Sequence, residues 1–89
     1  MKKILSLSVK MQNTEENFLF KKEDKLGIVL PAGTVFEPVE NYRGKVYNHY
    51  YNETKDEFVT NIDVLHPQVL SFQIDDFTLE MIKNGWFKK

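Results

Sequence analysis

The feature that most constrains the fold is a repeated alternation of apolar and polar residues in short segments bounded by turn-forming residues. Every second side chain is apolar over residues 5–11, and the same period recurs over residues 58–62 and 70–74. A period of two residues is typical of a β-strand that buries one face. The segments recur at about the 8–12-residue spacing of small β-barrels and sandwiches, so the sequence predicts about five to seven short strands.

Residue usage also favours strands over helices. The chain has one alanine, Ala32, against 18 valine, isoleucine and threonine residues and 12 aromatic residues. Alanine is the best helix former, whereas β-branched and aromatic residues prefer strands. Because the chain has 89 residues, we expect a single small β domain over residues 1–89 with a hydrophobic core of its own.

Three consecutive segments follow the first strand and its polar turn. Residues 18–20 start a second strand, which runs into the charged residues 21–25. We expect that charged run to form a solvated hairpin tip. Residues 26–30 then resume an extended apolar segment.

Turn chemistry divides the middle of the chain. Pro31–Gly33 predicts a turn, because proline fixes the first turn position and glycine accepts a positive φ near its end. A strand is expected over residues 34–39, where Pro38 fits an edge strand or a bulge better than a central strand. Residues 41–44 predict another turn, and residues 45–51 predict a strong strand.

The period changes near the C-terminus, where the sequence predicts one short helix over about residues 77–84. Asp75 or Asp76 can cap its start, and Gly85 is well placed as a left-handed cap at its end. A helix of this length is unstable alone, so it must dock on the sheet. We expect it to dock through Leu79, Ile82 and Trp86, which have helical spacing, with Met81 beside them. Trp86 and Phe87 are the expected anchors.

The predicted fold is therefore mainly β, or β-rich α+β: a small five- to seven-stranded antiparallel barrel or bent sheet with one short C-terminal helix. The run Leu30–Phe36, a variable hairpin, then Phe58-Val59 and a short break near Asp63 together resemble a small SH3-like barrel. The resemblance covers residues 26–74 at most and carries no diagnostic motif. It implies a fold outline, and a fold alone does not imply a function.

Charge and composition exclude several function classes. Twelve basic and thirteen acidic residues nearly cancel, whereas a dedicated duplex-DNA binder shows a strong basic excess. The chain has no cysteine, which excludes disulfides, thiolate catalysis and cysteine-ligated metals. The first nine residues superficially resemble a signal peptide, but Lys10 interrupts the apolar stretch and no small-residue cleavage site follows. We therefore expect a cytoplasmic protein that does not enter the membrane.

Residue types that carry chemistry are present but not arranged for catalysis. His49 and His66 are far apart in the sequence and belong to no ligand motif, whereas a metal site needs three or four converging ligands. Adjacent carboxylates on a strand point to opposite faces, and the glycines are scattered singly, which leaves no phosphate-binding loop. We expect a protein without enzymatic activity, catalytic residues, bound metal or cofactor.

The one local concentration of recognition-type residues lies at residues 42–51, which contain all four tyrosines. On a regular strand Tyr47, His49 and Tyr51 share one face, and tyrosine, arginine and histidine together suit a recognition surface. The alternative is that these tyrosines only flank the core of a small β domain. The candidate binding residues are Tyr42, Arg43, Lys45, Tyr47, His49 and Tyr51.

Three functional hypotheses follow. The first is a non-enzymatic binding module that engages a protein partner. A narrower version is a phage- or mobile-element-encoded inhibitor of a host or defence protein, which rests on the AT-rich codon usage that eleven lysines and seven asparagines suggest. The second is a binder, sponge-like and homo-oligomeric, of a small nucleotide or other anionic ligand, with charge from Arg43, Lys45 and His49. The third is binding of single-stranded nucleic acid by lysines that converge in space.

Overall fold

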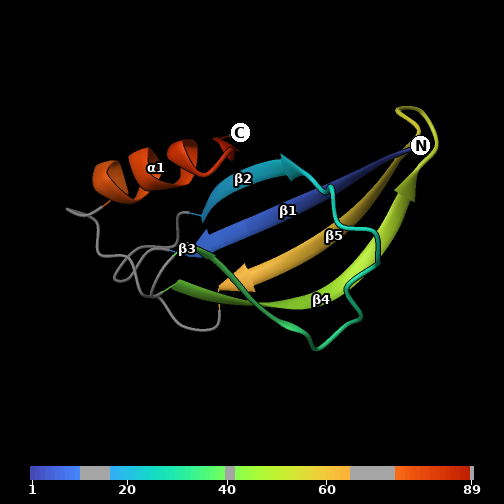
Figure 1. The fold of residues 1–89 in the computed structure, drawn as a ribbon, viewed down its shortest axis with the longest axis horizontal. Helices are drawn as coiled ribbons and strands as arrows, with labels where there is room; N and C mark the ends of the chain where they lie inside the picture. The colour runs from blue at the N-terminus through green and yellow to red at the C-terminus, as the bar shows by residue number, and fades with distance from the viewer. Residues whose placement is uncertain (11–16, 40–41, 65–73, 89) are drawn as a thin grey trace.

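The computed structural model describes residues 1–10, 17–39, 42–64 and 74–88 (Figure 1). They form six strands and one helix, which confirms a mainly β fold with one C-terminal helix. In chain order the elements are β1 (Lys2–Lys10), β2 (Asn17–Glu23), β3 (Val35–Val39), β4 (Tyr42–Asn52), β5 (Glu57–Val64), α1 (Ile74–Lys83) and β6 (Phe87–Lys88).

All six strands belong to one sheet in the order β3-β4-β5-β1-β2-β6, which curls into a half-barrel. Four neighbouring pairs are antiparallel, but β1 and β5 are parallel. The sheet is therefore mixed, and the expectation of an antiparallel sheet was wrong in this one pairing. Alternation along a strand reports which face is buried, and it carries no information on which strand lies beside it or in which direction.

One face of the sheet, here called the inner face, carries the core. Leu5, Leu7 and Val9 of β1 are buried there, and Leu5 and Leu7 lie beside Thr60 and Ile62 of β5. Phe20 of β2, Val46 of β4 and Val39 of β3 extend this core, with Phe77, Met81 and Trp86 from the C-terminal region. The opposite face of the same strands is the outer face.

Helix α1 covers one end of the inner face (Figure 1). Phe77 packs edge-on against Phe20, with ring centroids 5.6 Å apart. The helix ends at Lys83, and Gly85 forms the predicted left-handed cap after it, with a φ of 88°. The Trp86 amide donates to the Met81 carbonyl and the Gly85 amide to the Ile82 carbonyl. This pattern is the Schellman motif, and it turns the buried Trp86 back under the helix.

The docking face of the helix was only partly predicted. Trp86 is an anchor, but Phe87 is 68 % exposed and is not. Leu79 and Ile82 also point away from the sheet, whereas the expected Met81 is buried against it together with Phe77, which was not expected there. The helix begins at Ile74 rather than at residue 77. Two apolar stripes are present on it, and contact with the sheet selects the one that includes Met81.

The other end of the inner face is covered by residues 24–34, which run from β2 across to β3 (Figure 1). Lys3 donates from its Nζ to the Leu26 carbonyl at 3.0 Å, and the His49 ring nitrogen Nε2 lies 2.7 Å from the Leu30 carbonyl. Leu30 itself packs against the core. This covering segment, residues 24–34, is irregular over residues 26–30, where the sequence predicted an extended apolar segment.

The charged run at residues 21–25 does not form a hairpin tip. Residues 21–23 belong to β2 and pair with residues 4–6 of β1. Asp24, which follows them, is buried. The charges are tolerated within the strand because Lys21 and Glu23 are on the outer face, while Lys22 places its amine beside the end of α1.

The middle of the chain follows the prediction in two of three places. Pro31–Gly33 forms the expected turn, closed by a hydrogen bond from Thr34 N to the Pro31 carbonyl. The strand with Pro38 is an edge of the sheet. The turn predicted at residues 41–44 is wrong for Tyr42–Gly44, which already belong to β4. The alternation over residues 70–74, which predicts a last strand, lies outside the described residues except for Ile74, which begins α1. The only helix among the described residues is too short and too polar to span a membrane.

Candidate binding surface on the outer face

A β-bulge in β4 decides which side chains reach the outer face. Val46 pairs with Ile62 and Asn48 pairs with Asn61, so Tyr47 is an extra residue on β4 with no direct partner on β5. An inserted residue reverses the facing of every later residue on its strand. Tyr47, Asn48 and Tyr50 therefore lie on the outer face, whereas His49 and Tyr51 lie on the inner one.

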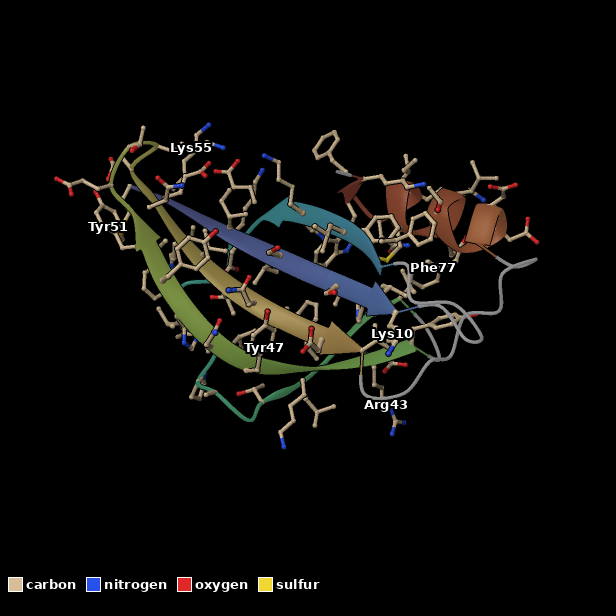
Figure 2. All side chains as sticks on the ribbon, turned by 180° about the vertical axis from the view of Figure 1, so that it is seen from behind. Lys10, Arg43, Tyr47, Tyr51, Lys55 and Phe77 are labelled. Atoms are coloured by element: carbon tan, nitrogen blue, oxygen red, sulfur yellow. The ribbon has the colours of Figure 1, made fainter. Side chains whose placement is uncertain are left out.

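The bulge overturns the expectation that Tyr47, His49 and Tyr51 share one face. That expectation assumed an uninterrupted strand. Only His49 and Tyr51 are on the same face, and each has its own local partner. Figure 2 shows that Tyr47 lies along the middle of β4, while Tyr51 and Arg43 lie near its two ends.

The residues brought together by the bulge form what we call the outer-face cluster: Tyr47, Asn48, Tyr50, Val59, Asn61 and Asp63. Tyr47 and Tyr50 are each 49 % exposed. Asn61 donates from Nδ2 to Oδ1 of Asn48 at 2.8 Å, which fixes both amides. Val59 is only 5 % exposed although it lies on this face, between Tyr50 of β4 and Ile4 of β1. The cluster therefore has an apolar base and aromatic and amide groups above it.

The ionisable groups of the cluster are close enough to influence one another. Partial burial raises the pKa of the Tyr47 phenol, and the nearby Asp63 carboxylate and Tyr50 raise it further. Burial also raises the pKa of Asp63. Lys45 is paired with Asp63 in the sheet register, so a positive charge borders the cluster. A hollow of about 500 Å³ lies beside Tyr47 and is lined by Lys45, Asp63 and the turn at Gly33, among others.

The six residues predicted as one site lie in four places. Arg43, Lys45 and Tyr47 are exposed along the outer face. Tyr42 packs its ring 4.8 Å from that of Phe77 and belongs to the core margin. For Tyr42, the core-flanking alternative holds.

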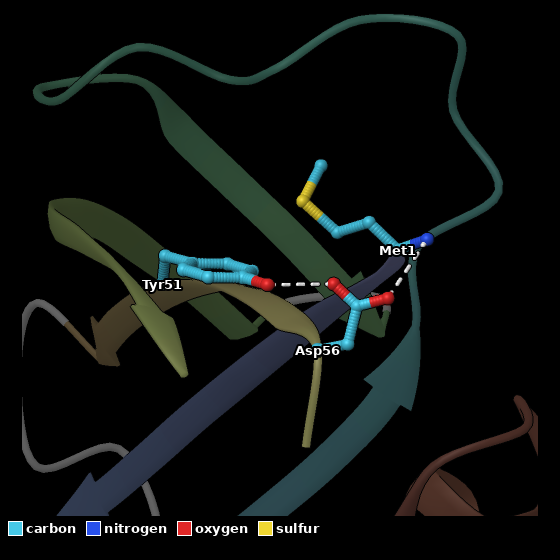
Figure 3. Close-up of polar contacts among 3 residues, drawn as sticks. All are labelled: Met1, Tyr51 and Asp56. Carbon is cyan, nitrogen blue, oxygen red and sulfur yellow. Dashed lines mark hydrogen bonds and ion pairs between the residues drawn. The ribbon is translucent and has the colours of Figure 1, made fainter. Parts of the chain in front are cut away.

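His49 and Tyr51 serve the fold at two other positions. The His49 ring stacks on Phe58 at 5.6 Å and bonds the Leu30 carbonyl, so it holds the segment that covers the inner face. The Tyr51 hydroxyl donates to Oδ1 of Asp56 at 2.7 Å, at the far end of the sheet (Figure 3). The other oxygen of Asp56 lies 3.4 Å from the N-terminal amine.

Sequence reasoning missed Tyr50, Asn48 and the three β5 residues of the outer-face cluster. Tyr50 was assigned to the opposite face because the bulge was not foreseen. One signal was available, since Val59, Asn61 and Asp63 alternate with the buried Thr60 and Ile62 and so had to share the other face of β5.

The basic side chains are divided between the two faces of the sheet, which limits the ligands that one chain could bind. Arg43 and Lys45 are exposed on the outer face, while His49 is engaged on the inner face. These three residues of one chain therefore do not line a common nucleotide pocket. The lysines are divided in the same way, since Lys3 and Lys22 reach inner-face partners while Lys21 is on the outer face. Among the described residues, no group of three or more histidine, aspartate or glutamate side chains could hold a metal ion.

Comparison with protein-family models, with curated proteins and with solved structures finds no match. The SH3-like outline is thus untested by any solved structure and stays a prediction. The function must be argued from the surface itself.

Proposed function

We propose that this chain is a non-enzymatic binding module that engages a protein partner through the outer-face cluster. The observation that carries the proposal is the bulge at Tyr47, which gathers two half-exposed tyrosines on the sheet face that no described element covers. The inner face supplies the stability of the domain, which leaves the outer face free for recognition.

The chemistry of the cluster suits a protein partner. Tyrosine offers a large, rigid contact area with a polar tip, and it is enriched among the residues that dominate binding energy. Tyr47 and Tyr50 are mounted on a strand, so little conformational freedom is lost when they bind. The fixed Asn48–Asn61 pair presents its remaining amide groups at known positions. Lys45 and Asp63 place charges of opposite sign at the border of the cluster, and these charges can fix the orientation of a bound partner.

A matched pair of double variants tests the proposal. Tyr47→Ala/Tyr50→Ala removes the aromatic groups of the cluster, and Leu79→Ala/Ile82→Ala removes two comparably exposed side chains from the free side of α1. Affinity capture from a low-GC bacterial lysate is compared for wild type and both variants, and the captured protein is then measured in a direct binding assay. We expect the tyrosine variant to lose about 30-fold or more in affinity, since hot-spot truncations cost about 2 kcal/mol or more.

A photo-crosslinking residue at position 61, compared with one at position 79, identifies the contact surface independently. Crosslinks to the partner are expected from position 61 only. A folded tyrosine variant that keeps full affinity, or crosslinks from position 79 alone, would show that the outer face is not the binding surface.

The same samples address the narrower hypotheses. The inhibitor hypothesis requires the captured partner to lose activity when bound. The homo-oligomer hypothesis requires a self-association that the tyrosine variant weakens, measured by light scattering over a concentration series. Binding to single-stranded nucleic acid would instead show a steep loss of affinity with added salt.

A further inference from the structure

A second hollow lies on the inner side of the sheet, between the two elements that cover that face. It has a volume of about 560 Å³ and opens between the end of α1 at Gly85 and the start of the covering segment at Asp24–Leu26. Its size falls within the range of about 300–1,000 Å³ that is typical of small-molecule sites. None of the six candidate residues in β4 lines it.

The base of this hollow is apolar. Leu5 is almost fully buried beneath it, and Phe36 packs edge-on against Trp86 with ring centroids 6.3 Å apart. Leu26 forms part of the wall and is 46 % exposed. The hollow can therefore take an aliphatic or aromatic body of modest size.

Asp24 is the unusual residue of the lining, because it is a carboxylate only 8 % exposed. Its position is fixed at two points. Its backbone amide donates to the Lys3 carbonyl at 2.7 Å, and its Oδ1 accepts the Leu26 amide at 2.9 Å. No ion pair within the described part of the chain includes it. A buried carboxylate is costly without a cationic partner, so this group is suited to receive an ammonium from a ligand.

Two lysines, Lys22 and Lys25, line the same hollow, together with Glu23, whose position in β2 is on the outer face. Lys22 is held by a hydrogen bond from its Nζ to the Asn84 carbonyl at 2.9 Å and lies 5.8 Å from the centre of the Trp86 ring. Lys25 is exposed beside Asp24. These positive charges disfavour a ligand that is only cationic, and they favour one that also carries a carboxylate.

We propose that this hollow binds a small zwitterion with an apolar body, of the class of the apolar α-amino acids. Asp24 receives the ammonium group, Lys25 and Lys22 attract the carboxylate, and the side chain lies on Leu5 and Phe36. The site is on the opposite face from the outer-face cluster. Its test can therefore fail or succeed without any effect on the proposed function.

The test is an NMR titration of the ¹⁵N-labelled full chain with L-phenylalanine. Two matched probes accompany it: 3-phenylpropanoate lacks the ammonium group, and phenethylamine lacks the carboxylate. We expect saturable shifts of the amides around residues 24–26 and 85 with L-phenylalanine, and affinities at least about tenfold weaker with each of the other two, since each loses a charge-assisted contact.

Two variants test the residue assignment. Asp24→Asn keeps the Oδ1 acceptor for the Leu26 amide but removes the charge, and Lys25→Met changes only the rim. Each should weaken L-phenylalanine about tenfold or more, whereas Glu53→Gln in the distant turn should leave it unchanged. The proposal is overturned if L-phenylalanine gives no saturable shift at millimolar concentration, or if either truncated probe binds equally well. It is also overturned if both site variants fold and retain wild-type affinity.

Discussion

The two faces of this sheet are built from the same strands but have opposite surroundings. On the inner face, alternate residues of β1, β4 and β5 are buried beneath α1 and residues 24–34. On the outer face, no described element covers the residues between them. In a chain of this size one covered face is enough for a core, so the second face is free to vary without loss of the fold.

A similar contrast divides β4 at its bulge. Before Tyr47, the inward residues Gly44 and Val46 are buried in the sheet. After it, the inward residues His49 and Tyr51 are polar groups that hold local structure through hydrogen bonds. Stability is therefore expected to depend strongly on the inner face and weakly on the outer face.

The adjacent aromatic residues Trp86 and Phe87 should give the largest contrast. Trp86 is 1 % exposed and packs in the core, whereas Phe87 is 68 % exposed. Trp86→Ala should cost about 3–5 kcal/mol of unfolding free energy, because it removes a large buried ring and leaves a cavity. Phe87→Ala should stay within about 0.5 kcal/mol of wild type. Urea denaturation measures both, and equal losses would contradict this view of the C-terminal anchor.

Two glycines provide the next contrast. A Cβ at Gly44 would lie 2.6 Å from Cγ2 of Ile62 and 2.9 Å from the Asp63 carbonyl oxygen, whereas one at Gly27 would meet no atom within 4 Å. Gly44→Ala should therefore cost about 1–3 kcal/mol through overpacking. Gly27→Ala should be neutral or stabilise by up to about 1 kcal/mol, because it restricts the unfolded chain. Thermal denaturation of the two variants measures both changes in stability. A neutral Gly44→Ala would show that β4 and β5 do not approach each other this closely.

These contrasts show how far the sequence could predict the fold. Alternation over residues 5–11 and 58–62 was sufficient for β1 and β5, because each buries one face. The alternation could not reveal that β1 and β5 pair in parallel, because it reports only which face of each strand is buried. The helix was predicted, but of its docking face only Met81 and Trp86 were, because Leu79 and Ile82 are as apolar as Phe77 and Met81.

The candidate site was less predictable than the fold. A single inserted residue at Tyr47 changes the face of every later side chain on β4, and no local residue preference requires it. The concentration of tyrosines drew attention to β4, which carries part of the proposed binding surface. The tyrosines are separated between core margin, outer face and turn, and this separation depends on the pairing with β5, which is a property of the tertiary structure.

The bulge itself can be tested with the neighbours His49 and Tyr47. His49→Ala loses the hydrogen bond to the Leu30 carbonyl and the stacking on Phe58, so it should cost about 1–2 kcal/mol. Tyr47→Ala should cost at most about 1 kcal/mol, because its ring is half exposed on the outer face. Hydrogen exchange at residues 28–34 should accelerate in the His49 variant only. The reverse order of destabilisation would mean that Tyr47, not His49, faces the covering segment.

The smallest effect is expected from the exposed pair of Tyr51 and Asp56. The hydrogen bond from Tyr51, followed by the N-terminal amine, lowers the pKa of Asp56 below its ordinary value of 3.8. A carboxylate with a lowered folded pKa stabilises above its unfolded pKa, and this contribution is lost as pH falls below 3.8 through the folded pKa. The same bond raises the pKa of Tyr51 above 10.0, so the phenol's contribution is lost as pH rises through that raised value.

Tyr51→Phe removes the bond and should move the Asp56 pKa back up towards 3.8, as measured by NMR titration of its carboxyl carbon. The dependence of unfolding free energy on pH should become shallower below pH 3.8 and above pH 10.0. The matched control is Tyr50→Phe, since Tyr50 is as exposed as Tyr51 but lies on the opposite face of β4. If Tyr50→Phe shifts Asp56 as much as Tyr51→Phe does, the assignment of Tyr51 to the inner side of the bulge is wrong, and with it the separation of the two faces.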